Sequence, residues 1–349
     1  MTDSDSPESS SVPAWLAGWR GKLILVGFSL LVCVLFLEVA LRIVGVGAAV
    51  EDDGATTIAY HETLGWDLVP GSSERHITPE FDVEVAINEQ GFRDGQIYPE
   101  ARLDGVRRIV VIGDSFSFGH GVEEVESWPA LLEAWMADTE VINLSVAGYG
   151  TDQQILRFDE HGASFEPDVV MLGLFIGDIF RNARTSHYGY AKPRFVLDDG
   201  APRLVNVPVP EARIGPPLSR LWGMVGTRLW SIAEHRGMGE AWPVTAALLD
   251  HLAERCAELG AELVVVVIPK DGAITGSGWR KSLHLDSLDV TTTMLESGGH
   301  RFIDLTPALA DAAETTELYF PQDGHWTAAG HRVAMAAILD DLQSTDTDG

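Results

Sequence analysis

The chain has 349 residues, of which 24 are basic and 52 acidic, giving a formal net charge of −28. This balance argues against nucleic acid as a partner, because phosphate binding needs clustered lysine and arginine. A hydrophobic content of 46% excludes disorder over the whole chain. The two cysteines, Cys33 and Cys256, match no metal-ligand spacing, and we expect no disulfide between them.

An apolar segment near the start of the chain is typical of a membrane-spanning helix. Residues 1–22 are mostly polar, and we expect them to be disordered. Residues 23–41 follow with a single charge, Glu38. A helix of that length spans about 28 Å, close to a bilayer hydrocarbon core of about 30 Å. Arg42 lies one helical turn after Glu38, so the two side chains can pair.

We therefore expect a single-pass anchor over residues 23–45 that contacts the lipid bilayer of the cell membrane. Residues 1–22 would be cytoplasmic and the rest of the chain extracytoplasmic. Arg20 and Lys22 on the N-terminal flank favour this orientation, whereas Arg42 on the other flank works against it. A cleaved signal peptide is one alternative, and a buried core helix is another.

The remainder of the chain divides into three parts. Residues 51–105 form a membrane-proximal lead-in, in which the alternation of residues 82–87 predicts a strand. Residues 106–343 form a domain of alternating strands and helices. Within it, residues 184–240 break the alternation and are interpreted as an insertion near the site. The insertion contains a predicted hairpin over residues 194–205.

The domain has the pattern of an α/β fold. Predicted strands cover residues 108–112, 140–144, 168–175, 263–268 and 301–305, and predicted helices cover residues 127–137, 151–161, 246–259 and 330–342. Near-continuous apolar strands that alternate with helices indicate a mainly parallel sheet covered on both faces.

A serine follows the first of these strands. The segment GDSFSFG (113–119) places Ser115 beyond the carboxyl end of the strand, where parallel α/β sheets carry their sites. A hydroxyl there can act as a nucleophile among backbone N–H groups. Helix capping is the alternative role of such a segment.

Two later segments supply the other parts of a serine–histidine–acid site. Gly148 follows the second strand, where its N–H can face an oxyanion, although a loop that needs positive φ also explains this glycine. Near the C-terminus, His325 can act as general base for Ser115, and Asp323 can orient it. The alternatives are an exposed loop in which Asp323 caps the last helix, and a metal site with His331. We expect no metal, because no further ligand cluster is evident.

Three segments together resemble the GDSL/SGNH hydrolase superfamily: GDSFSFG (113–119), NLSVAGYG (143–150) and DGHWTAAGH (323–331). The apolar segment and the NEQGFR turn (88–93) are also similar to the lead-in of membrane-anchored bacterial members. The resemblance covers residues 107–342. It implies a flavodoxin-like three-layer α/β/α sandwich that hydrolyses esters without a cofactor, preceded here by one transmembrane helix. It further implies Ser115 as nucleophile, His325 as base, Asp323 as its partner, and the N–H groups of Ser115 and Gly148 as the oxyanion hole.

One block departs from the family pattern. The third block of the family carries an asparagine whose side chain donates to the oxyanion. Here the third strand is followed by Gly177 and Asp178, so a glycine or an aspartate takes its place. Asp178 can donate only when protonated, and Asn182 is a candidate if its loop folds back.

The resemblance implies a serine esterase that removes an acyl group, for example acetyl, from a carbohydrate or cell-envelope glycan. Two alternatives stay open. A polysaccharide O-acyltransferase uses the same acyl-enzyme chemistry with a sugar hydroxyl in place of water. A weakened SGNH-fold binding or scaffold protein would fit the missing asparagine.

Overall fold

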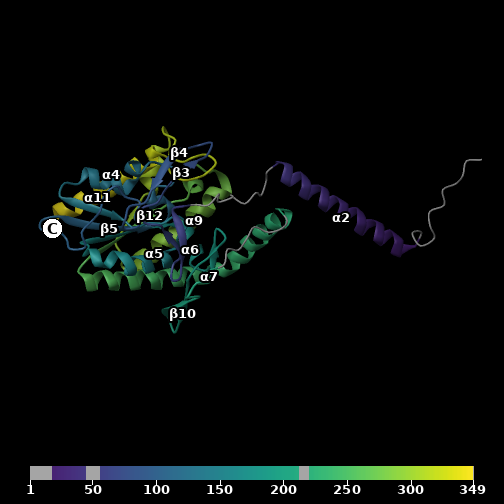
Figure 1. Ribbon diagram of the computed structural model, residues 1–349, viewed down its shortest axis with the longest axis horizontal. Helices are drawn as coiled ribbons and strands as arrows, with labels where there is room; N and C mark the ends of the chain where they lie inside the picture. Colours follow the sequence, from purple (N-terminus) through teal and green to yellow (C-terminus); the bar gives the residue numbers. More distant parts are fainter. Residues whose placement is uncertain (1–17, 45–55, 212–219, 349) are drawn as a thin grey trace, which may run out of the picture. The chain divides into compact units, whose positions relative to one another are not determined.

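The computed structural model describes residues 18–44, 56–211 and 220–348 (Figure 1). The chain divides into two units, residues 1–52 with 215–233, and residues 53–214 with 234–349. Residues 1–17 of the predicted N-terminal tail, 51–55 of the lead-in and 212–219 of the insertion lie outside the described residues. Cys33 and Cys256 are both free thiols.

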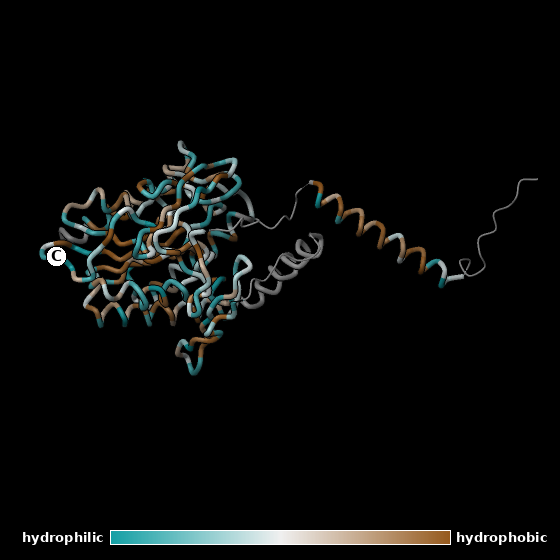
Figure 2. Tube along the Cα trace, in the orientation of Figure 1, coloured by the Kyte–Doolittle hydropathy of each residue, from teal (hydrophilic) through white to brown (hydrophobic). Residues whose placement is uncertain are grey.

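The first unit contains a long apolar helix, α2 (Trp19–Val44). It begins four residues before the predicted anchor, so Arg20 and Lys22 lie in its first turns. Its large apolar side chains are exposed, and Figure 2 shows a nearly continuous hydrophobic colour along it. Glu38 and Arg42 form the predicted ion pair at 2.8 Å. Length and composition make α2 a candidate membrane span or signal sequence.

The second unit is built on a five-stranded parallel sheet with the strand order β13-β12-β7-β5-β6. The strands are β5 (Arg107–Gly113), β6 (Thr139–Asn143), β7 (Val169–Phe175), β12 (Glu262–Ile268) and β13 (Phe302–Asp304). Every predicted strand is present, with each end within one residue of its prediction. The continuous apolar runs identify these strands because both faces of the sheet are buried.

Helices cover both faces of this sheet. They are α4 (Trp128–Trp135), α5 (Thr151–Arg157), the second-unit part of α7 (Arg220–Leu259), α9 (Gly278–Gly298), α10 (Thr306–Ala312) and α11 (Ala328–Asp348). Successive residues of a strand point to opposite faces. Ile112 of β5 packs in the core shared with α5, α7 and α9, whereas its neighbour Val111 packs in the core shared with α4, α10 and α11. Figure 1 shows α4 and α11 on one side of the sheet and α5 and α7 on the other. The expected three-layer α/β/α sandwich is confirmed.

Several helix bounds differ from their predictions. α5 ends at Arg157, because the chain continues as a π-helical turn over Phe158–Gly162 in which the Phe158 ring packs against Gly162. α7 runs unbroken through residue 240, so the predicted end of the insertion falls inside a helix. No helix was predicted between β12 and β13, where α9 lies, because serine, threonine and β-branched residues weaken its helical signal.

Four antiparallel hairpins complete the second unit. Two belong to the lead-in, β1 (Ile58–His61) with β2 (Gly65–Leu68) and β3 (Ser73–Ile77) with β4 (Asp82–Ala86); two belong to the insertion, β8 (Ser186–His187) with β9 (Tyr190–Ala191) and β10 (Arg194–Asp198) with β11 (Ala201–Val205). The predicted strand at residues 82–87 and the predicted hairpin at residues 194–205 are both confirmed. Trp66 of the lead-in packs with Phe118 and Tyr149, so the lead-in shares a core with the domain.

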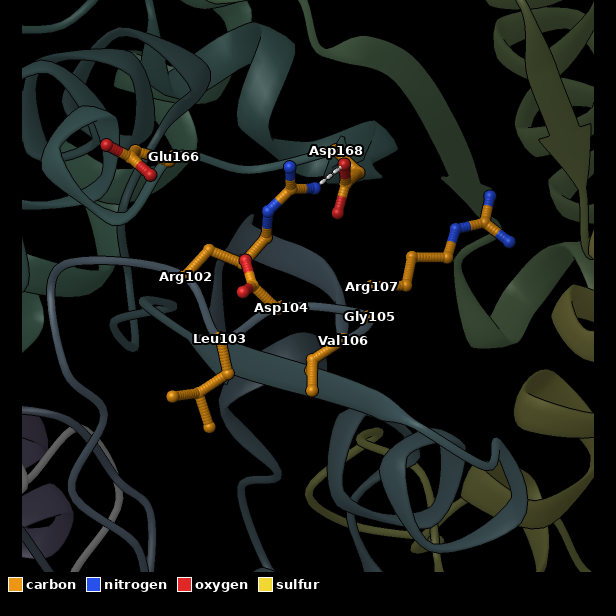
Figure 3. Close-up of a pocket in the computed structure, with 8 residues that line it drawn as sticks. All are labelled: Arg102, Leu103, Asp104, Gly105, Val106, Arg107, Glu166 and Asp168. Atoms are coloured by element: carbon orange, nitrogen blue, oxygen red, sulfur yellow. Dashed lines mark hydrogen bonds and ion pairs between the residues drawn. The ribbon is translucent and has the colours of Figure 1, made fainter.

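A polar cavity opens at the amino-terminal edge of the sheet, where β5 and β7 begin (Figure 3). Its lining includes the ion pair between Arg102 and Asp168. Parallel sheets carry their sites at the opposite, carboxyl edge. This cavity is therefore separate from the segment that contains Ser115.

Candidate active site

The segment after β5 presents Ser115 at a reversal of strand order. The chain passes from β5 to β6 on one side and then to β7 on the other, which is the switch point where doubly wound sheets bind ligands. Asp114 caps the short helix α3 (Ser115–Phe118) by accepting a hydrogen bond from the N–H of Phe116 at 3.0 Å. Ser115 is the first residue of α3, so its N–H has no partner within the helix.

Three side chains from two distant segments meet at this point. Ser115 Oγ lies 2.7 Å from His325 Nε2, and His325 Nδ1 lies 2.5 Å from Asp323 Oδ1. The carboxylate can only accept, so the imidazole proton belongs on Nδ1 and the lone pair of Nε2 faces the serine hydroxyl. A neutral histidine in this tautomer can take a proton from Ser115. The structure thus brings together the residues predicted as nucleophile, base and acid.

The charge of Asp323 suits the role of orienting a base. Partial burial acts to raise its pKa, but contacts with His120 and His325 outweigh that effect and hold the pKa well below its ordinary value. Glu80, in the turn between β3 and β4, accepts hydrogen bonds from the N–H groups of Gln322 at 3.0 Å and Asp323 at 2.8 Å. The lead-in therefore helps to fix the loop that carries the acid.

His120 is a site residue that the sequence analysis did not find. Its Nε2 lies 3.5 Å from Asp323 Oδ2, the oxygen that His325 does not use. Its ring centroid is 4.6 Å from that of His325. Burial lowers the pKa of His120, which keeps the ring neutral at physiological pH. In the sequence, only the position of His120 in the turn directly after α3 could have identified it as a site residue.

Backbone donors for an oxyanion are present on two loops. Within the part of the chain that the structure describes, no acceptor is recorded for the N–H of Ser115 or of Gly148. Gly148 has φ +81°, and an added Cβ would lie 2.9 Å from the Tyr188 ring, so both its conformation and its surroundings require glycine. Arg181 ties the two loops together, because its Nη1 donates to Asp114 Oδ2 and to the Tyr149 carbonyl, each at 2.8 Å.

Neither Asp178 nor Asn182 is free to donate a third hydrogen bond to the oxyanion. The two carboxylate oxygens of Asp178 accept hydrogen bonds from Arg181 at 2.6 Å and Gln154 at 2.8 Å. Burial, with the nearby Asp114 charge, raises the pKa of Asp178 well above its ordinary value despite Arg181. The amide of Asn182 donates to Thr245 Oγ1 at 2.8 Å, and its oxygen accepts from the backbone N–H of residue 152. Both side chains are engaged in packing α6 (Ile176–Arg181) and its C-terminal end against neighbouring helices.

The space that the family's asparagine would need is filled. At Gly177 an added Cβ would lie 2.3 Å from the Phe175 ring. That ring stacks on Phe116, next to Ser115, with a centroid distance of 4.7 Å. The guanidinium carbon of Arg181 lies 5.6 Å from the Phe175 centroid. An aromatic ring and a buried cation therefore occupy the region beside the third strand.

His331 does not join Asp323 and His325 as a metal ligand. It is fully buried, and its Nδ1 accepts a hydrogen bond from the N–H of Trp128 at 3.2 Å. It connects α11 to the start of α4, which is a structural role.

Comparison with known families gives an independent assignment. Residues 111–333 match the model of the GDSL-like lipase/acylhydrolase family, and the chain belongs to this family. No curated protein is significantly similar to the chain.

Solved structures with a similar fold are remote in sequence. TesA shares 16% identity, with 68% of this chain and 99% of TesA covered and a TM-score of 0.43. The acetylxylan esterase Axe2 from Geobacillus stearothermophilus shares 12%, with coverages of 69% and 96% and a TM-score of 0.45. A lipolytic protein of the G-D-S-L family from Veillonella parvula shares 12%, with coverages of 67% and 97% and a TM-score of 0.42.

Proposed function

We propose that this protein is a serine esterase that removes an acyl group, such as acetyl, from an acylated carbohydrate of the cell envelope. The observation that carries the proposal is the series of hydrogen bonds from Ser115 Oγ through His325 to Asp323, at 2.7 and 2.5 Å. Membership of the GDSL-like lipase/acylhydrolase family supports an ester as the bond that is cleaved.

In the acylation step, Ser115 Oγ attacks the ester carbonyl carbon while its proton passes to His325 Nε2. Asp323 stabilises the imidazolium that forms. The carbonyl oxygen becomes an oxyanion that accepts hydrogen bonds from the N–H groups of Ser115 and Gly148. When the tetrahedral intermediate collapses, the bond to the sugar oxygen breaks, and that oxygen leaves with the proton of His325.

In the deacylation step, water attacks the acyl carbon and gives a proton to His325. The acid is released when the bond to Ser115 breaks, and His325 returns the proton to Oγ. An acyltransferase differs only in using a sugar hydroxyl here. The side chains of His325 and Asp323 are 19% and 26% exposed, so water reaches them, which favours hydrolysis.

The carbohydrate part of the proposal depends on Tyr188. Its side chain is 68% exposed, and its ring lies against the backbone of Gly148, one of the proposed oxyanion donors. An exposed aromatic ring beside the reacting carbonyl offers a flat apolar face on which a sugar ring can stack. Tyr188 has φ +48° because it is one of the two central residues of the turn between β8 and β9.

A catalytically weakened binding protein is the second candidate, and the Phe175 ring in the place of the asparagine favours it. The position of Arg181 argues in the other direction. Its guanidinium bridges the loops that carry Ser115 and Gly148, so it holds the two proposed backbone donors in place. We therefore prefer the esterase to the binding protein as the proposed function.

Covalent labelling tests the nucleophile. The full-length protein in detergent is treated with a fluorophosphonate, and the adduct is mapped by mass spectrometry. We expect a label on Ser115 that is lost in Ser115→Ala and strongly reduced in His325→Ala. An unlabelled but folded protein would support the binding protein instead.

Kinetics with two substrates test whether the enzyme recognises the carbohydrate part of its substrate. Tyr188→Ala is expected to raise KM for an acetylated oligosaccharide and to leave KM for a small alkyl acetate nearly unchanged. Equal effects on both substrates would contradict stacking of a sugar on Tyr188. Transfer of the acetyl group to a second sugar, in place of release as acetate, would indicate the acyltransferase.

A further inference from the structure

Metal-binding atoms gather beside the proposed catalytic base. We propose that His120, Asp323 and His325 form a site for a divalent cation of the zinc type, and that occupation of the site inhibits the enzyme. One ring nitrogen from each histidine and one carboxylate oxygen lie within 4.8 Å of one another. Binding at this site is independent of the proposed function, whereas the inhibition depends on it.

The donor set suits zinc, and one of its spacings already matches a zinc site. Zinc binds histidine nitrogen and carboxylate oxygen at about 2.0–2.2 Å, so ligand atoms on a tetrahedral ion lie about 3.3–3.6 Å apart. The distance from His120 Nε2 to Asp323 Oδ2 is 3.5 Å, which matches this spacing. His325 Nδ1 lies 2.5 Å from the other carboxylate oxygen in a hydrogen bond, so a metal ion would replace the proton between them and move the two atoms apart. Two histidines and one carboxylate leave a fourth position for water, as in many zinc sites.

The charge around the ligands favours a cation. Glu80 accepts a hydrogen bond from the N–H of Asp323 at 2.8 Å and adds a second negative charge beside the site. A chain with a net charge of −28 further favours the approach of a cation.

The His120 ring is fixed by packing before any ion arrives. The Phe81 ring meets it edge-on with a centroid distance of 5.3 Å, and the centroid of the His76 ring lies 5.9 Å away. His76 in turn contacts Glu74 Oε1 at 2.7 Å. A ligand that is already oriented loses little side-chain freedom on binding, which raises affinity for the metal ion.

Inhibition follows from the tautomer of His325. In the metal-free site the single proton of the neutral ring is on Nδ1, and Nε2 accepts from Ser115. A metal ion on Nδ1 requires that the proton move through solvent to Nε2. Nε2 is then a donor and has no lone pair for the serine proton, so the general base is lost.

Calorimetric titration of Zn²⁺ into the full-length protein tests binding directly. His120→Gln removes the imidazole but keeps an N–H that can reach Asp323. We expect it to weaken Zn²⁺ binding by about tenfold or more, a loss of about 1.4 kcal/mol or more. The matched control is His300→Gln, because His300 also pairs with an aspartate, Asp250, at 3.1 Å, but lies just before β13 at the amino-terminal edge of the sheet. The control is expected to bind Zn²⁺ like the unmodified protein.

Fluorophosphonate labelling of Ser115 tests inhibition. We expect Zn²⁺ to block labelling, EDTA to restore it, and His120→Gln to need about tenfold more Zn²⁺ for the same block. Absence of Zn²⁺ binding, equal affinity in His120→Gln, or full labelling at saturating Zn²⁺ would each overturn the proposal. If Ser115 is not labelled even without metal, the proposed function fails, but the titrations still decide whether the site exists. If His120→Gln does not fold, Asp323→Asn, which removes the anionic ligand, takes its place.

Discussion

Asp178 follows the third strand at a position of the family's third block, yet its two oxygens bond to Arg181 and Gln154. An asparagine there keeps one acceptor oxygen and replaces the other by an amide NH2 group, so one of these two hydrogen bonds is lost. We therefore expect Asp178→Asn to lower ester turnover at pH 7 or leave it unchanged. The measurement is kcat for a small alkyl acetate. A clear rise in kcat would mean that residue 178 reaches the oxyanion after all.

His331 makes stability depend on pH. Burial lowers its pKa to about 3, whereas in the unfolded chain the pKa is near 6.5. Between these values the unfolded state binds the extra proton, so stability is complete above about pH 6.5 and falls as the pH decreases, by at most about 1.4 kcal/mol per pH unit.

His331→Asn offers an acceptor to the Trp128 N–H without titrating. We expect this variant to be less stable at pH 7 but to lose less stability between pH 6.5 and pH 4. Urea unfolding at several pH values measures the slope. A slope equal to that of the unmodified protein would show that His331 does not contribute.

At the scale of elements, the β3–β4 hairpin forms hydrogen bonds with a loop more than 200 residues away in the sequence. Glu80 in its turn accepts two backbone hydrogen bonds from the loop that carries Asp323. A hydrogen bond to a charged group contributes about 1.5–3 kcal/mol. We expect Glu80→Ala to lower kcat by about tenfold and the thermal unfolding temperature by a few degrees, because the loop that carries Asp323 loses both hydrogen bonds.

The matched control is Glu84→Gln, since Glu84 lies exposed on β4 of the same hairpin. It is expected to keep normal kcat. An unchanged kcat in Glu80→Ala would show that the acid loop holds its position without the lead-in.

At the scale of the whole molecule, α2 raises the question of location. We propose that it anchors the protein in the cell membrane, with the N-terminus cytoplasmic and the domain outside. We expect the full-length protein to stay in the membrane pellet after a carbonate wash, and a chain that starts at residue 51 to be soluble. N-terminal sequencing of the mature protein separates the alternatives, because a cleaved signal peptide removes the apolar segment.

The sequence by itself determined the sheet, the order of its strands along the chain and the candidate catalytic residues. Strands buried on both faces appear as continuous apolar runs, and Ser115, Gly148 and Asp323 with His325 lie in short segments with a recognisable local pattern. These signals are local, so they can be read without knowing what packs against them.

Only the tertiary structure decided the surroundings of those residues. The Phe175 ring at Gly177, the bridge made by Arg181, and the contacts of His120 and Glu80 with the Asp323 loop all join segments that are distant in sequence or depend on which way a side chain turns. No local pattern reports such contacts, because packing and burial select them after the strands and helices have formed.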